Sequence, residues 1–143
     1  MTATRLYQNT ARIHFDAFTA AQGRFGKRLI YGGHVISLAR ALSFNGLANA
    51  FHIAAINGGR HVAPLFAGKT VFAWSEVLAV SELPGRDDVG ALRLRTVATA
   101  DRTCADFPYK LALGPAEGRT RVNGEDYDPA VLLDLDYWVL VPR

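Results

Sequence analysis

The chain has 143 residues, 50% hydrophobic and 20% charged, with a formal net charge of +3. Such values suit one globular domain with a buried core and exclude an intrinsically disordered chain. No apolar run is long enough for a membrane-spanning helix, and no Lys/Arg block favours nucleic acid. With Cys104 as the single cysteine and no signal-peptide core, we predict a protein of the reducing cytoplasm.

The first third of the chain is expected to be helical. Residues 1–7 suit the last turns of a helix and residues 15–21 a short helix, followed by a glycine-broken loop at 23–27. Residues 32–46 form the clearest helix, because apolar side chains recur every three or four positions and Gly46 suits its end. Its narrow apolar face, rich in Ala and Ser, predicts a helix that lies against a sheet.

From residue 51 onward the pattern predicts strands. Stretches rich in β-branched and aromatic residues occur at 52–65, 70–81, 90–100 and 132–141, and turns are expected at Pro84-Gly85, Gly114-Pro115 and Asn123-Gly124. Asp134 and Asp136 share a strand face with Trp138, which favours the edge of a sheet. The order of elements predicts an α+β fold in which an antiparallel meander wraps around one long central helix.

Two short segments carry the residues best suited to catalysis. One places Asn9 and His14 five positions apart in an irregular stretch, and the other places Gly32 and Gly33 at the start of the long helix. An imidazole with a pKa of about 6.5 can hold and deprotonate water. An unsatisfied N–H at a helix N-terminus can face a developing oxyanion. Together they predict acid–base chemistry beside a carbonyl group.

Three segments match successive motifs of one family. Residues 9–16 contain a polar residue with a His five positions later, and residues 30–33 contain an apolar-x-Gly step that opens the helix. Residues 60–70 contain an Arg-x-x-x-Pro-x-x-x-Gly strand turn. On these motifs the chain resembles the MaoC-like hydratases and dehydratases, which have the hot-dog fold. Residues 31–40 and 133–138 give a narrower resemblance to the C-terminal hot-dog half of one subgroup, the mesaconyl-CoA hydratases or β-methylmalyl-CoA dehydratases.

The chain departs from the family pattern in three places. Asn9 stands where most members have a catalytic Asp, and Gly32 stands where many have His. Only eight residues precede Asn9, whereas the family has a strand and most of a helix there. We therefore expect residues 1–143 to form one MaoC-like hot-dog domain that lacks the family's first strand, with the sheet and the site completed by another chain or half.

The resemblance implies a hydro-lyase that reversibly hydrates an enoyl-CoA thioester, with mesaconyl-CoA and β-methylmalyl-CoA as the expected pair. His14 and Asn9 would hold and activate water, and the Gly33 N–H would bind the thioester oxygen. Because an amide does not titrate, Asn9 would only orient water, and a role as a turn or helix C-cap residue stays open. For His14, a purely structural hydrogen bond to the backbone stays open.

Five further residues are candidates for substrate binding: Tyr31, Gly32, His34, Arg40 and Arg60. Tyr31 or His34 could touch the distal carboxylate of a dicarboxylic acyl group, although a packed or capping role suits His34 equally. Arg40 could recognise a carboxylate or act as an ion-pair partner. Arg60 could reach the CoA phosphates or remain a surface charge.

No metal or redox cofactor is expected, because the four histidines lack metal-ligand spacing and CoA enters as part of the substrate. The alternatives are a non-catalytic acyl-CoA-binding or scaffold half, and a hot-dog thioesterase. Residues 32–50 contain no Asp or Glu, which argues against the thioesterase arrangement. Open strand edges predict a homodimer or higher oligomer through hot-dog pairing, or pairing with a second hot-dog half.

Overall fold

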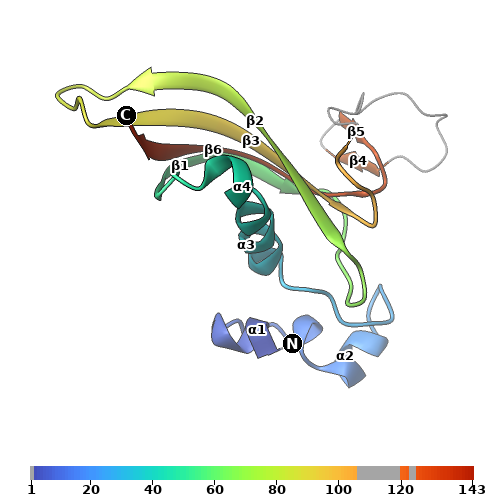
Figure 1. Ribbon diagram of the computed structural model, residues 1–143. Helices are drawn as coiled ribbons and strands as arrows, with labels where there is room; N and C mark the ends of the chain where they lie inside the picture. Colours follow the sequence, from blue (N-terminus) through green and yellow to red (C-terminus); the bar gives the residue numbers. More distant parts are fainter. Residues whose placement is uncertain (1, 106–119, 123–124) are drawn as a thin grey trace.

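The computed structural model describes residues 2–105, 120–122 and 125–143. A curved antiparallel sheet wraps around one helix, and the short N-terminal helices gather beneath that helix's first turn (Figure 1). The helices are α1 (Thr2–Leu6), the 3-10 helix η1 (Arg12–His14), α2 (Ala17–Ala21), α3 (Gly32–Leu42) and α4 (Phe44–Leu47). The strands are β1 (His52–His61), β2 (Val71–Glu82), β3 (Val89–Ala100), β4 (Thr120–Val122), β5 (Glu125–Tyr127) and β6 (Val131–Pro142).

The central helix is shorter than the predicted 32–46, because Ser43 separates α3 from α4. The Ser43 hydroxyl donates to the Ala39 carbonyl at 2.9 Å and also lies 2.9 Å from the Ser75 hydroxyl on β2. A serine that bonds back to the preceding turn competes with the helical backbone pattern. The interruption therefore ends α3 and fixes its C-terminal end to the sheet.

The four long strands lie in the order β1-β6-β3-β2, so the sheet is antiparallel but is not the predicted meander. β6 enters between β1 and β3, and the prediction that Asp134 and Asp136 lie at a sheet edge is therefore wrong. Each carboxylate instead pairs with an arginine on the neighbouring β3, Asp134 with Arg95 at 2.7 Å and Asp136 with Arg93 at 2.5 Å. These cross-strand pairs let four charged side chains occupy the middle of the sheet.

The core lies between α3 and the concave face of the sheet. α3 contributes Val35 and Ala39, and the sheet contributes large buried side chains: Leu94, Leu133, Leu135, Tyr137 and Val139. The small residues of α3 let the helix approach the sheet closely. Among the described residues, no helix is long and apolar enough to cross a membrane.

The N-terminal segment is tied to the rest of the molecule through the loop that precedes α3. In this loop the Leu29 N–H donates to the Ile13 carbonyl at 3.1 Å, and the Ile30 N–H donates to the Leu65 carbonyl at 2.8 Å. The loop is thus held between η1 on one side and the β1–β2 connection on the other. Of the predicted turns, Gly85 has a φ of 74°, as a turn glycine requires, while residues 114–115 and 123–124 lie outside the described residues.

Candidate active site

A cavity of about 580 Å³ lies where the N-terminal segment, the first turn of α3 and the connection after β1 meet. Its polar side chains are those of His14, Arg24 and His61, and the other lining residues are glycine or apolar. Two of the predicted site residues, His14 and Gly32, therefore line one cavity although they come from different elements. An apolar cavity with few polar groups is the usual form of a small-molecule site.

A backbone carbonyl beside His14 determines which nitrogen of the neutral imidazole carries the proton. Its Nδ1 lies 3.2 Å from the Leu29 carbonyl oxygen. A carbonyl can only accept, so Nδ1 carries the proton and Nε2 of the neutral ring keeps a lone pair. The Tyr31 ring meets the imidazole edge-on, with centroids 5.6 Å apart. The backbone hydrogen bond that sequence reasoning left open is therefore present, and it leaves Nε2 able to act as a base.

Asn9 ends α1 in a Schellman-type turn. Gln8 has a left-handed backbone with φ 56°, and the Asn9 N–H donates to the Thr4 carbonyl at 3.2 Å. The Asn9 side-chain oxygen accepts the Ala11 N–H at 2.8 Å. Asn9 does not line the cavity. Its observed role is that of a turn residue which positions the segment leading to His14.

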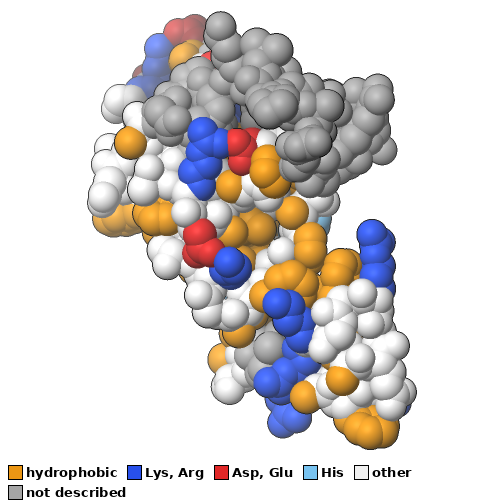
Figure 2. Space-filling model, turned by 90° about the vertical axis from the view of Figure 1, so that its right-hand side faces the viewer, with side chains coloured by type: hydrophobic (Ala, Val, Ile, Leu, Met, Phe, Trp, Pro, Cys, Tyr) orange, Lys and Arg blue, Asp and Glu red, His pale blue; other side chains and the backbone are white. Residues whose placement is uncertain are grey.

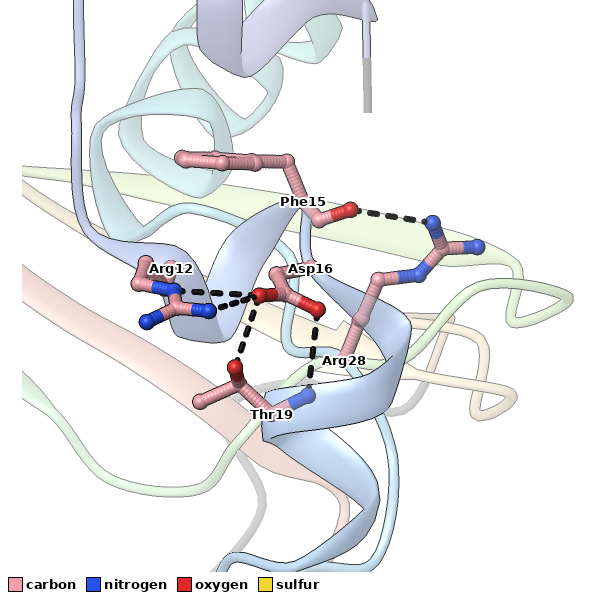
Figure 3. Close-up of polar contacts among 5 residues, drawn as sticks. All are labelled: Arg12, Phe15, Asp16, Thr19 and Arg28. Carbon is pink, nitrogen blue, oxygen red and sulfur yellow. Dashed lines mark hydrogen bonds and ion pairs between the residues drawn. The ribbon is translucent and has the colours of Figure 1, made fainter.

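The acidic residue that follows His14 is committed to structure rather than to proton transfer. The Asp16 carboxylate caps α2 by accepting the backbone N–H of Thr19 at 3.0 Å and its hydroxyl at 2.7 Å, and it pairs with Arg12 at 2.7 Å (Figure 3). The Thr19 hydrogen bonds and the Arg12 contact hold the pKa of Asp16 far below its usual range. Arg28 donates to the neighbouring Phe15 carbonyl at 3.3 Å. Asp16 is therefore a fixed anion and cannot supply a proton near neutral pH.

Both glycines at the start of α3 are covered by rings. A Cβ atom on Gly32 would lie 2.8 Å from Nε2 of His61, and one on Gly33 would lie 2.6 Å from the Tyr31 ring. Tyr31 is the N-cap residue of α3, so the helix itself leaves the first N–H groups unsatisfied. Gly32 lines the cavity, whereas Gly33 does not. The glycines are needed for this close approach, and the helix N-terminus faces the cavity at Gly32.

His61, at the end of β1, is the site residue that sequence reasoning missed. Its ring lies over Gly32 and lines the cavity, and partial loss of water contact lowers its pKa. Strand alternation could have found it, because neighbouring residues point to opposite faces. Arg60, which was predicted to bind substrate, points to the other face and donates to the Tyr127 hydroxyl at 3.1 Å.

The remaining candidates separate into two groups. The Tyr7 ring packs near both Tyr31 and His34, with centroids 5.9 and 6.3 Å apart, beside the first turn of α3. Within the described residues, the buried Nδ1 of His34 has no hydrogen-bond partner. Arg40 lies nearer the other end of the helix, where it donates to the Ala50 carbonyl at 2.6 Å and lines a separate hollow. The structure thus brings Tyr31 and His34 to the N-terminus of α3 and leaves Arg40 apart.

In the part of the chain that the structure describes, no group of three or more His, Cys, Asp or Glu side chains could hold a metal ion. The Cys104 sulfur lies 3.7 Å from the Thr99 hydroxyl and outside the cavity. The chemical groups that converge on the cavity are therefore two imidazoles, a guanidinium and a helix N-terminus. This set suits proton transfer and stabilisation of a carbonyl-derived anion.

Comparison with known proteins shows two relatives by sequence, while no family model matches the chain. Over 143 residues it is 64% identical to a β-methylmalyl-CoA dehydratase from Chloroflexus aurantiacus, and over 145 it is 58% identical to a mesaconyl-CoA hydratase from Cereibacter sphaeroides. Both matches cover all of this chain. The chain spans only 38% and 37% of these relatives' own lengths.

Solved structures agree on the fold. A MaoC domain dehydratase from Chloroflexus aurantiacus superposes with a TM-score of 0.85 at 64% identity, covering all of this chain and 38% of that one. A Mycobacterium tuberculosis protein with a double hot-dog fold has a TM-score of 0.61 at 23% identity, over 99% of this chain and 34% of that one. The predicted resemblance to the MaoC-like hydratases and dehydratases is thus confirmed, and the chain has the hot-dog fold. Its narrower resemblance, to part of the mesaconyl-CoA hydratases, is confirmed as well.

Proposed function

We propose that the protein catalyses the reversible addition of water to an enoyl-CoA thioester, with mesaconyl-CoA and β-methylmalyl-CoA as the substrate pair. The arrangement of His14 carries this proposal, because the Leu29 carbonyl fixes the proton on Nδ1 and leaves Nε2 as a base. The names of the two relatives support the choice of substrate. CoA takes part as a portion of the substrate, and the reaction needs no redox cofactor.

In the hydration direction, Nε2 of His14 accepts a proton from water while the water oxygen bonds to the β-carbon of the enoyl group. The electrons of the double bond move toward the thioester, whose oxygen becomes negative. The Gly32 N–H, which lies at the positive end of α3 and in the cavity lining, stabilises that oxygen in place of the predicted Gly33 N–H. His14 then returns its proton to the α-carbon, so one water molecule is added and the base is restored.

Replacement of His14 by alanine tests this function. We expect H14A to lose turnover by about 100-fold or more, since a positioned general base contributes roughly that factor. The measurement is the loss of enoyl-thioester absorbance with mesaconyl-CoA and with crotonyl-CoA. His52, an exposed residue at the start of β1 that does not line the cavity, provides the matched control H52A. Equal turnover in folded H14A and H52A would contradict the proposal.

One observation favours a second candidate, a non-catalytic acyl-CoA-binding half. Asn9 replaces the family's usual acid, and its side-chain oxygen is occupied by the Ala11 N–H. This candidate predicts binding of CoA thioesters without turnover in the wild-type protein. A thioesterase would instead release free CoA, which a thiol reagent detects.

We also propose that the chain pairs with a second hot dog, either another copy or a further half. β1 is a long edge strand on which every residue except Arg60 is exposed. Ile53 and Ile56 of this strand are 42% and 60% exposed. Unpaired N–H and C=O groups beside exposed apolar side chains favour strand pairing across an interface.

A further inference from the structure

Two cationic side chains lie over aromatic rings, and one of the two, Arg24, lines the cavity. The guanidinium carbon of Arg24 lies 5.2 Å from the centre of the Phe25 ring, and the Lys27 ammonium lies 4.1 Å from that of Phe66. The two rings meet edge to face with centroids 6.0 Å apart. Arg24 and Phe25 line the cavity that contains His14. The contact between the two rings links the Lys27 side chain to the side of the cavity that Arg24 and Phe25 line, although Lys27 and Phe66 are not part of that lining.

These two charges are not neutralised by the residues that the structure describes. Neither Arg24 nor Lys27 has an ion pair or a hydrogen bond there. The carboxylates of Asp16 and Asp101 each form an ion pair with a different basic side chain, Arg12 and Lys69 respectively. Lys and Arg side chains are prominent on the lower part of the face in Figure 2, over the N-terminal segments, with no acidic side chain in view among them. Such uncompensated positive charge attracts an anion.

We propose that Arg24, with Lys27 beside it, forms an oxyanion subsite for the substrate of this cavity. The bound anion is the distal carboxylate of a dicarboxylic acyl group or a phosphate of CoA, and the inference rests on the proposed function. Arg24 is exposed to solvent, and apart from the two imidazoles the rest of the cavity lining is glycine or apolar, so Arg24 is the lining residue with a permanent positive charge. The planar guanidinium offers paired N–H donors that match carboxylate and phosphate oxygens.

The test uses saturated thioesters, which bind without reacting, so binding is measured apart from turnover. Calorimetry compares methylsuccinyl-CoA, butyryl-CoA and the N-acetylcysteamine thioester of methylsuccinate, which has no phosphate. R24Q should bind methylsuccinyl-CoA about tenfold or more weakly than wild type, as expected for a lost charge-assisted hydrogen bond. R24K keeps the charge without the planar fork and should lose less.

Arg5 supplies a matched control. Its guanidinium carbon lies 5.6 Å from the centre of the Phe15 ring, so it makes the same kind of aromatic contact, but it does not line the cavity. R5Q removes the same charge and should change each affinity by less than twofold. Comparison of R24Q with R5Q therefore separates a local contact from a general loss of positive charge.

The pattern of losses identifies the anion. If R24Q weakens both methylsuccinyl thioesters and leaves butyryl-CoA unchanged, the carboxylate is bound. If it weakens both CoA thioesters and leaves the N-acetylcysteamine thioester unchanged, the phosphates are bound. Equal affinities in R24Q and R5Q, or no binding of any thioester by the wild-type protein, would overturn the subsite. Binding that depends on Arg24 in a protein without hydratase turnover would refute the proposed reaction and leave the subsite standing.

Discussion

The hydrogen bond between His14 and the Leu29 carbonyl determines which imidazole nitrogen can act as a base. The sequence motif predicts that His14 is important, but it gives no information about the proton on Nδ1. That proton depends on a carbonyl 15 positions away along the chain. At the scale of single residues, the motif therefore identifies the base and the fold determines its tautomer.

Replacement of Asn9 by aspartate should preserve the turn and keep or raise turnover. Aspartate can accept the same hydrogen bond from the Ala11 N–H, and it restores the acid that most of the family has at this position. N9A removes the acceptor, so we expect a lower melting temperature and lower turnover. Enoyl-thioester absorbance and thermal melting measure both effects. Complete loss of turnover in N9D would show that the amide itself is required.

Replacement of Gly32 by alanine should displace the His61 ring rather than unfold the protein. The new methyl group would lie 2.8 Å from Nε2 of His61, but the ring is partly exposed and can turn into water. We expect the pKa of His61 to rise toward its ordinary value in G32A, and NMR titration measures it. Gly46 has open space around it, so G46A is the control. An unchanged His61 titration in G32A would contradict the observed packing.

The same change should alter how stability depends on pH. Because the pKa of His61 is lowered in the folded protein, the unfolded chain binds the proton more readily. This contribution to the free energy of unfolding is therefore full above about pH 6.5 and decreases as the pH falls. Urea unfolding at pH 7.5 and 5.5 should show a smaller difference in G32A than in G46A.

At the scale of elements, a chain of hydroxyl groups fixes the end of α3 to the sheet. It runs from Ser43 to Ser75 at 2.9 Å, to Thr96 at 2.7 Å and to the Tyr137 hydroxyl at 3.0 Å. Periodicity predicted one helix through this point, because Ser is compatible with a helix and its partners are distant in the sequence. Separation along the sequence also explains why Asp134 and Asp136 were predicted to lie at a sheet edge, since their arginine partners lie on β3.

Replacement of Thr96 by valine tests the importance of this chain. Thr96 is 1% exposed, and valine keeps its shape but leaves the two neighbouring hydroxyls without this partner. We expect a loss of about 1–3 kcal/mol in the free energy of unfolding, measured with urea. The exposed Thr10 provides the control T10V, which should change stability by less than about 0.5 kcal/mol. Equal stability of T96V and T10V would show that the hydroxyl chain contributes little.

At the scale of the whole molecule, the sequence predicted the elements better than their arrangement. Each predicted long strand appears, because alternation and turn residues are local signals, although β1 ends at His61, earlier than the predicted 65. The strand order could not be predicted, since β6 reaches its place only through pairing with β1 and β3. The site shows the same limit: His14 and Gly32 line one cavity, whereas other predicted site residues do not line it, including Asn9, Gly33, Arg40 and Arg60.

A charge on the exposed edge of β1 should weaken pairing between copies. Ile56 is 60% exposed on that edge, and we expect I56K to shift a homodimer toward monomer, because a buried lysine without a partner is unfavourable at an interface. Light scattering across the micromolar range measures the change. Val80, 74% exposed on β2 at the other edge, gives the control V80K. A monomeric wild-type protein, or a dimer weakened only by V80K, would exclude pairing of two copies through β1.

Leu29 bonds to η1 through both of its backbone groups: its N–H to the Ile13 carbonyl and its carbonyl to His14. Movement of the N-terminal segment away from this loop would break both bonds together, and the base would lose its fixed tautomer at the same moment. We therefore expect the Leu29 amide to exchange its proton with solvent when the base is also released. The hydrogen-exchange rate of this amide then measures how often His14 is released from the Leu29 carbonyl in the resting protein.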